Sequence, residues 1–371
     1  MRTAISERLG IEFPLFAFSH CRDVVAAVTN AGGFGVLGAI SYSPARLDTE
    51  LSWIDERVGG RPYGVDVLVP GGVDAAGLDH GFIPDRHRDF VTHLFGKYGV
   101  TAPARSYGGP AGEVGRRVTA SGATDLIEVA LKHPIGLIAS ALGPPPPEMV
   151  RLARAAGVPV AALVGTVEHA RRQVEAGADL IVAQGTEAGG HTGEVSTLVL
   201  VPQVVDAVAP VPVLAAGGIA SGRQMAAGLA LGAQGVWCGS VWLTTEEAET
   251  PPVVKRKLLA ATSLDTVRSR SRTGKPARQL RSAWTAEWDS APESPGALDM
   301  PLQMLLAEGA MRGIGAAAEQ GEPGAVELAN YFVGQVVGQL DRVRPAREVV
   351  YEMIAEFADA VERLNGTFTT E

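Results

Sequence analysis

A glycine-rich segment holding a single histidine, QGTEAGGHTG at 184–193, is the part of this chain best suited to chemistry. Its candidate residues are Gln184, Gly185, Gly189, Gly190 and His191. A histidine near neutral pH can serve as acid, base or neutral hydrogen-bond donor, and a glutamine amide can both donate and accept. The ordinary alternative is a surface-loop histidine. The flanking glycines favour the functional interpretation, because they would let a flat ligand lie against the loop.

Two further glycine loops are typical of anion binding. AAGGIASG (215–222) contains Gly217 and Gly218, and CGSVWLTT (238–245) contains Gly239 and Ser240. Exposed backbone N–H groups at the start of a helix bind phosphate well, although a tight turn or an N-cap serine explains either loop alone. Because the two loops would follow neighbouring strands, we expect them to share one phosphate.

Two more residues are candidates for the substrate side. His20 follows the apolar run at 13–18, where it either touches ligand or caps the next helix, and Ser140 ends the run at 135–140. A metal site is not expected. His87 and His93 are six residues apart, which does not place them on one helix face, and Cys21 and Cys238 belong to no metal-type pair.

The elements that must position these residues form a regular alternation. Short apolar runs, typical of strands buried on both faces, occur at 13–18, 33–38, 63–69, 135–140, 158–164, 179–184, 211–217 and 234–239. Amphipathic stretches of helical length separate them, for example 147–157, 168–179 and 221–234, with Ser221 as an N-cap. Eight β-then-α units favour a (β/α)₈ TIM barrel, whose active sites lie at the carboxyl ends of the strands.

The remaining sequence predicts additions to that barrel. We expect the barrel to occupy 1–261, with an insertion at about 71–120 that carries one helix. From 262 to 371 no strong strand pattern is visible, and this part is expected to form a C-terminal helical lobe beside the barrel mouth. The arginine-rich stretch at 268–281 is interpreted as a solvated face.

Composition excludes several classes of protein. The 371 residues are 46% hydrophobic and 20% charged, and the formal net charge is −9. An acidic chain without a polybasic segment is not expected to bind nucleic acid or an anionic membrane. With two distant cysteines, no secretion signal and no long apolar run, we expect a cytoplasmic protein.

At this point the chain resembles the FMN-dependent nitronate monooxygenases, formerly 2-nitropropane dioxygenases, which are related to FMN-dependent enoyl reductases. The resemblance spans nearly the whole chain. It is carried by NAGGFGVLG (30–38), YGVDVLVP (63–70), QGTEAGGHTG (184–193), AAGGI (215–219), CGS (238–240), TGKPAR (273–278) and GQVVGQL (334–340).

The resemblance implies a role for each matched residue. Gln184 and the glycines after it would meet the flavin, the loops with Gly217 and Gly239 would hold its phosphate, and His191 would face the substrate. Two places depart from the family. Phe16-Ala17-Phe18 replaces a small-Pro-Met segment, and Asp66 stands where the family has an asparagine. A carboxylate at 66 would oppose negative charge on a reduced flavin ring, accept a hydrogen bond from substrate, or stay protonated.

The resemblance implies oxidation of nitronates or nitroalkanes by FMN and O₂ to a carbonyl compound and nitrite. For a nitronate, His191 would hold the nitro oxygens; for a nitroalkane it would remove the α-proton. The alternative is an NAD(P)H-dependent reductase of an activated C=C bond in an enoyl-CoA or enoyl-carrier substrate, in which the arginines at 268–281 would bind a CoA or carrier phosphate. The expected partners are a small-molecule substrate and O₂, with a homodimer left open. A phosphate-sugar isomerase or a binding protein on the same barrel would be colourless.

Overall fold

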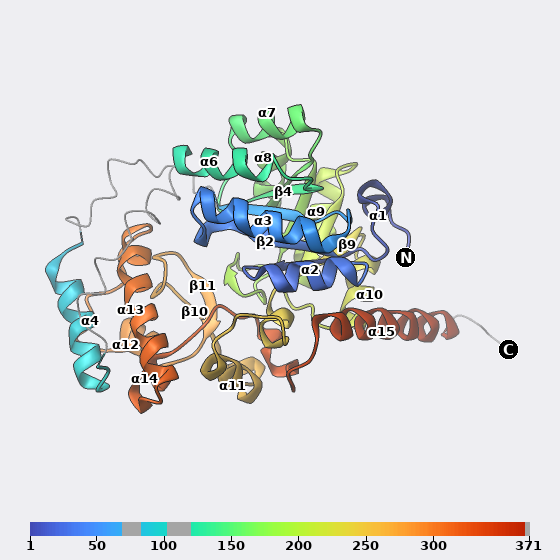
Figure 1. Ribbon diagram of the computed structural model, residues 1–371. Helices are drawn as coiled ribbons and strands as arrows, with labels where there is room; N and C mark the ends of the chain where they lie inside the picture. The colour runs from blue at the N-terminus through green and yellow to red at the C-terminus, as the bar shows by residue number, and fades with distance from the viewer. Residues whose placement is uncertain (69–82, 102–119, 368–371) are drawn as a thin grey trace.

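A closed parallel barrel of eight strands forms the centre of the molecule, in the order β1-β2-β3-β4-β5-β6-β8-β9 (Figure 1). The computed structural model describes residues 1–68, 83–101 and 120–367. The barrel strands are β1 Leu15–Ser19, β2 Phe34–Gly38, β3 Gly64–Leu68, β4 Leu137–Ala141, β5 Val160–Val164, β6 Leu180–Gln184, β8 Val213–Ala216 and β9 Gly235–Cys238. Each coincides with one of the eight apolar runs, with β1 and β4 ending one residue beyond theirs, so the predicted (β/α)₈ barrel is confirmed.

Alternation along the strands decides which residues reach the barrel interior. One cluster of buried residues fills the inside of the barrel, and it includes Phe16, Leu180, Val182 and Trp237. Their neighbours along the strands belong to other clusters, packed between the sheet and the helices. Because successive side chains point to opposite faces of a strand, the same alternation decides which residue at the end of each strand faces the cavity.

Helices cover the outside of the barrel, and the residues predicted to start or end them do so. The elements are α1 Ala4–Leu9, α2 Arg22–Asn30, α3 Pro44–Val58, α4 Asp85–Lys97, α6 Ala120–Ala130, α7 Pro147–Ala156, α8 Val167–Glu175, α9 Thr197–Val208, α10 Gly222–Ala230 and α11 Pro252–Ala260, with 3₁₀ turns η1 Ala39–Ser41 and η5 Ser240–Thr244. Ser221 caps α10 by accepting a hydrogen bond from the backbone of Gln224. Gly157 ends α7 in the left-handed conformation that favours glycine.

The residues after α11 hold strands as well as helices. They form η6 Ser263–Asp265, β10 Thr266–Ser269, β11 Ala277–Leu280, α12 Ala283–Ser290, α13 Leu302–Glu319, α14 Pro323–Leu328, η7 Gln335–Gln339 and α15 Ala346–Gly366. β10 and β11 are antiparallel, and β11 also pairs with β7, Gly190–His191. The expectation of no strands beyond 262 is therefore wrong. These strands are only four residues long and polar, so they show no hydrophobic alternation.

The arginine-rich stretch is a solvated face only in part: Arg270 and Arg281 are exposed, whereas Arg278 is not. Arg278 is only 9% exposed, and its side chain donates hydrogen bonds to the backbone of Thr186 and the hydroxyl of Thr266. The three-stranded sheet places this arginine behind the 184–193 loop, where it holds that loop against the lobe.

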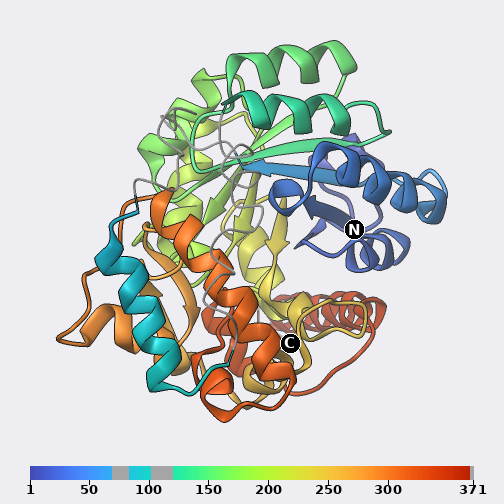
Figure 2. The same ribbon diagram turned by 60° about the vertical axis from the view of Figure 1, so that its left-hand side comes forward.

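Segments distant in the sequence build the lobe beside the barrel. In both views α4 lies against the helices of the 283–328 region (Figures 1 and 2). Phe90 of α4 packs edge-on to Trp288, and Tyr98 donates a hydrogen bond to Glu287. The part of the predicted insertion that the structure describes therefore belongs to this lobe; residues 71–82 and 102–119 lie outside the described ranges.

The last helix leaves the lobe and returns to the barrel. α15 packs along α10 and also touches α2 (Figure 1). Gly222 allows the close crossing, because a β-carbon there would lie 2.0 Å from the backbone oxygen of Met353. The backbone N–H of Gly222 also donates to Glu356. The division of the chain at 261 stays a prediction.

Substituting Gly222 tests this crossing. We expect Gly222→Ala to lower the free energy of unfolding by about 1–3 kcal/mol, because an added methyl group overlaps the α15 backbone and the helices must separate. Gly315→Ala is the matched control. Gly315 lies inside α13 with open space around its Cα, so alanine there should gain up to about 1 kcal/mol. Urea unfolding of both variants measures the difference; equal stabilities would contradict the close crossing.

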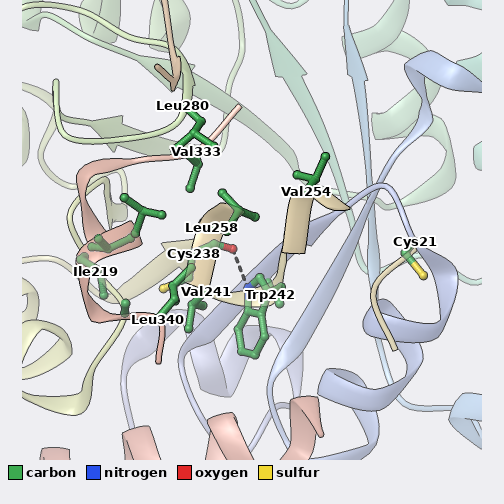
Figure 3. Packing of buried hydrophobic residues seen from close by; sticks show 14 of the residues in the cluster. Cys21, Ile219, Cys238, Val241, Trp242, Val254, Leu258, Leu280, Val333 and Leu340 are labelled. Atoms are coloured by element: carbon green, nitrogen blue, oxygen red, sulfur yellow. Dashed lines mark hydrogen bonds between the residues drawn. The ribbon is translucent and has the colours of Figure 1, made fainter. Parts of the chain in front are cut away.

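The lobe and barrel share one apolar core. Figure 3 shows residues from β9, η5, α11, β11 and the segment around Val333 in one cluster, with the Trp242 indole donating a hydrogen bond to the backbone oxygen of Cys238. In the described ranges, no helix is long and apolar enough to cross a membrane.

Candidate active site at the barrel mouth

A cavity of about 1010 Å³ opens at the carboxyl ends of the barrel strands. The predicted residues that line it are His20, Asp66, Gln184, Gly189, Gly190, His191, Gly217, Gly218, Gly239 and Ser240. They come from five barrel strands or from the loops that follow them, and the barrel closure brings these strand ends together.

Two predicted residues lie elsewhere. Ser140 is fully buried, does not line the cavity, and its hydroxyl has no hydrogen-bond partner within the described ranges. Leu137 and Ala139 face the barrel interior, so the parity of β4 turns Ser140 toward the helices. Gly185 is also outside the lining; a β-carbon there would lie 2.1 Å from the hydroxyl of Thr197. Ser140 was predicted on the substrate side and Gly185 at the cofactor, but neither residue lines the cavity.

The glycines of the 184–193 loop are required mainly by protein contacts. Gly189 faces the backbone of Gly334, 2.8 Å from where its β-carbon would be, and Gly193 is similarly close to Gly165. Gly190 has a φ of +76° and open space beside it. The loop is therefore thin because neighbouring backbone segments pack on it, and Gly190 alone presents an open face.

The two phosphate-type loops form a cradle of backbone groups. Gly217 and Gly218 have φ angles of +90° and +68°, a conformation that favours glycine. In the described part of the chain, the N–H groups of Gly218, Gly239 and Ser240 have no acceptor. The Ser240 hydroxyl accepts a hydrogen bond from the backbone of Gly334 at 2.8 Å. Backbone N–H groups without an acceptor that line a cavity are suited to binding a phosphate.

Glu187 organises this cradle from behind. Its carboxylate accepts a hydrogen bond from the backbone of Thr197 at the start of α9, and the Thr197 hydroxyl lies 3.0 Å from the backbone oxygen of Gly217. Glu187 stands within the QGTEAGGHTG stretch, yet its role was not predicted, because only the fold shows that α9 begins beside it.

His191 lies on β7, half-buried at the cavity wall, and its Nε2 is 2.8 Å from the hydroxyl of Thr273. Burial first, and then the positive charge of Lys275, lower the pKa of His191 to about 4. The imidazole is therefore neutral at physiological pH, with one N–H and one lone pair. No partner for Nδ1 occurs in the part of the chain that the structure describes.

Thr273 sets which of those two groups faces a ligand. Its hydroxyl lies 2.8 Å from Nε2 of His191 and 3.2 Å from the backbone oxygen of Lys275. When the hydroxyl donates to His191, Nδ1 carries the proton and is a donor. When it donates to Lys275, Nδ1 becomes an acceptor.

Positive charge surrounds this histidine. The Arg272 guanidinium lies 4.9 Å above the Phe332 ring, and that ring is 6.4 Å from the His191 ring. Arg272 donates to Asn330 and has no carboxylate partner within 4 Å among the described residues. Burial lowers the pKa of Arg272 to about 10, so it stays charged at neutral pH.

Sequence reasoning missed these lobe residues as site components. Arg272 and Thr273 precede or begin the TGKPAR motif, which was the available signal, whereas Phe332 belongs to no quoted motif. All three reach the cavity because β11 pairs with β7 and Gln279 bridges to Phe332.

His20 lies at the opposite wall. Its Nδ1 is 3.1 Å from the backbone oxygen of Gly38, which only accepts, so the proton sits on Nδ1 and the lone pair on Nε2. Its ring rests on Gly38, where a β-carbon would be 2.6 Å away. Desolvation lowers the pKa of His20, so this imidazole too is neutral at physiological pH.

Comparisons with known proteins agree with this geometry. The family model "Nitronate monooxygenase" matches residues 2–356. The Mycobacterium tuberculosis protein "Putative monooxygenase Rv1533" is 63% identical over 377 aligned positions, covering 99% of each chain. A Staphylococcus saprophyticus protein, "Probable nitronate monooxygenase", is 30% identical over 76% of this chain and 79% of its own.

A solved structure described as nitroalkane oxidase, from Streptomyces ansochromogenes, is also similar. It has a TM-score of 0.81 and 28% identity, covering 97% of this chain and 100% of its own. The match covers the barrel, the cavity and the lobe together. The chain belongs to the nitronate monooxygenase family and is an FMN-dependent oxidoreductase.

Proposed function

We propose that this protein oxidises nitronate anions to a carbonyl compound and nitrite, using bound FMN and O₂. The observation that carries the proposal is the wall around His191, where a neutral histidine and the Thr273 hydroxyl lie beside the cations Arg272 and Lys275. A neutral imidazole with this low pKa is a weak base but a competent hydrogen-bond donor. The wall therefore favours a substrate that already carries negative charge over a neutral nitroalkane that must first be deprotonated.

The residues present fit FMN. The N–H groups of Gly218, Gly239 and Ser240 would hold its phosphate, and the ring would extend across the mouth toward Gln184 and Gly190. When bound, FMN supplies the electron acceptor for the reaction. The chain's own contribution is to hold the nitro oxygens: His191 donates from Nδ1 while the Thr273 hydroxyl donates to Nε2, and the nearby cations offset the substrate charge.

Anaerobic mixing tests the proposal. We expect ethyl nitronate to bleach the flavin of the purified yellow protein within seconds, and air to restore the colour with release of nitrite. Neutral nitroethane, kept below the pH at which it ionises, should reduce the flavin at least about tenfold more slowly. If NADH or NADPH bleaches the flavin and the nitronate does not, the reaction is a reduction and the proposal fails.

The reductase alternative has one specific point of similarity. A structure described as FabK from Thermotoga maritima has a TM-score of 0.73 and 28% identity over 99% of this chain. Its score is lower than that of the nitroalkane oxidase, and the NAD(P)H arm of the experiment decides between the two reactions.

A further inference from the structure

An unpaired carboxyl group is buried at the cavity wall opposite the phosphate cradle. Asp66 is 6% exposed and lines the cavity from β3. The neighbouring β3 positions Val65 and Val67 pack outward against the helices, so strand parity turns Asp66 into the barrel interior. In the described part of the chain the Asp66 carboxyl has no hydrogen bond and no ion pair. A buried carboxyl without a partner is costly, so this group calls for a partner that the described residues do not supply.

The space around the carboxyl is a niche of small residues. Its register partners on the two neighbouring strands are Gly38 and Ala139, which offer no polar side chain. The His20 ring rests on Gly38, with its Nδ1–H bound to the Gly38 carbonyl. As far as the described residues define it, the niche opens toward the cavity, so a molecule that occupies the mouth can reach the Asp66 carboxyl.

Within residues 1–68, 83–101 and 120–367, no charged side chain contributes to the pKa shift of Asp66. Four described elements pack on β3. Three of them, β2, β4 and η1, contain no titratable side chain, and the acidic residues of the fourth, α6, lie on the outer face of the barrel. Among the described residues, the titratable groups elsewhere on the cavity wall are His20, Cys21, His169, Arg172, Glu187, His191, Cys238, Glu249, Arg272, Lys275, Glu308 and Tyr331. Burial alone raises the pKa of Asp66 to about 7, with no charged neighbour contributing.

We propose that Asp66 is a proton-holding residue of the cofactor site, whose protonated carboxyl donates a hydrogen bond to the edge of the FMN ring. This inference rests on the proposed function, because it requires FMN in the mouth. The ring edge carries carbonyl oxygens and ring nitrogens that accept hydrogen bonds, which the protonated acid satisfies and the carboxylate repels. Loss of this proton therefore weakens FMN binding, and the carboxylate opposes the negative charge that reduction places on the ring.

Titration of FMN affinity against pH tests the inference. In the natural protein we expect the Kd for FMN to rise about tenfold per pH unit above about pH 7, because binding then requires uptake of a proton. Asp66→Asn keeps the size of the side chain and an N–H donor but cannot ionise. Its affinity should match the natural protein at about pH 6 and change less than about twofold up to about pH 8.5.

Two further variants serve as controls. Glu308→Gln removes another carboxylate from the same cavity and should leave the pH dependence of the natural protein intact. His20→Gln removes the titratable ring that rests on Gly38 beside the niche, and it should also leave that pH dependence intact. The midpoint potential of bound FMN gives a second readout: it should fall more steeply with pH in the natural protein than in Asp66→Asn.

The outcomes distinguish a failure of the role of Asp66 from a failure of FMN binding itself. If the natural protein and Asp66→Asn show the same pH dependence, or Asp66→Asn has lost affinity at every pH, the role of Asp66 is wrong while FMN binding stands. If neither protein binds FMN at any pH, the proposed function itself fails. Should Asp66→Asn not fold, the pH dependence of the natural protein alone still decides, because a constant Kd between about pH 6 and 8.5 overturns the proposal.

Discussion

A His191→Ala variant is expected to retain FMN and to lose about 10²–10³-fold in kcat/KM for a nitronate. The side chain stands at the cavity wall with a free Nδ1, whereas the phosphate cradle belongs to other loops. Removing the imidazole deletes a donor to the substrate oxygens and leaves the cofactor contacts in place. The flavin absorbance of the purified variant and steady-state nitrite release measure the two effects separately.

The pKa of His191 also predicts how the activity of the natural protein depends on pH. Burial lowers the pKa of His191 to about 4, so its neutral form is present throughout the range above that value. Activity toward a nitronate should therefore show no transition from His191 between about pH 5 and 8, and the transition that belongs to His191 should appear only as pH falls toward about 4.

The matched control is His169→Ala, which removes another cavity histidine, from α8, and should keep activity within about twofold. A His191→Ala protein with the kcat/KM of the natural chain would show that this histidine takes no part in the reaction. Loss of flavin together with activity would instead assign His191 to cofactor binding.

A Gly239→Glu variant is expected to weaken FMN binding by about two orders of magnitude. Gly239 has a φ of −119°, which any residue adopts, and its β-carbon would meet nothing closer than Phe18 at 3.9 Å. A side chain there enters the cavity beside the free N–H groups of Gly239 and Ser240. A carboxylate about 5 Å from a phosphate costs roughly 3 kcal/mol per unit charge at an effective dielectric of about 20.

Gly239→Gln isolates the charge, because glutamine has the same size and shape without it. Its FMN affinity should stay well above that of Gly239→Glu, and the gap should narrow as salt is added. Flavin fluorescence titration measures both affinities. Equal Kd values for the two variants would mean that no anion lies in the cradle.

Much of the fold could be predicted because each barrel strand carries its own signal. The eight apolar runs are continuous where strands are buried on both faces, and helix ends were marked by residues such as Ser221 and Gly157. β10 and β11 could not be predicted in this way. β10 pairs with β11, and β11 pairs with β7, about 80 residues away in the chain, while the Arg278 side chain binds the 184–193 loop; these long-range contacts stabilise the strands.

In the candidate site, too, local sequence patterns predicted some residues, while others reach the cavity only through long-range contacts. The loops with Gly217 and Gly239 could be placed from their strands, because barrel strands carry the loops that follow them to one end. Ser140 was misplaced because a strand of unknown end leaves its parity open, and a one-residue difference reverses the face. Arg272, Thr273 and Phe332 could not be assigned at all, since they reach the cavity only through the lobe.

By itself the sequence determined the barrel, the loops at its mouth and the family to which they belong, because those depend on local hydrophobic pattern and on motifs within single loops. The tertiary structure decided what each motif residue does. It showed that Gly185, Gly189 and Gly193 serve backbone contacts, that burial and the charge of Lys275 hold His191 neutral, and that Asp66 is buried without a partner among the described residues. Burial, charge and proton position depend on neighbours brought from distant parts of the chain, and no local pattern contains that information.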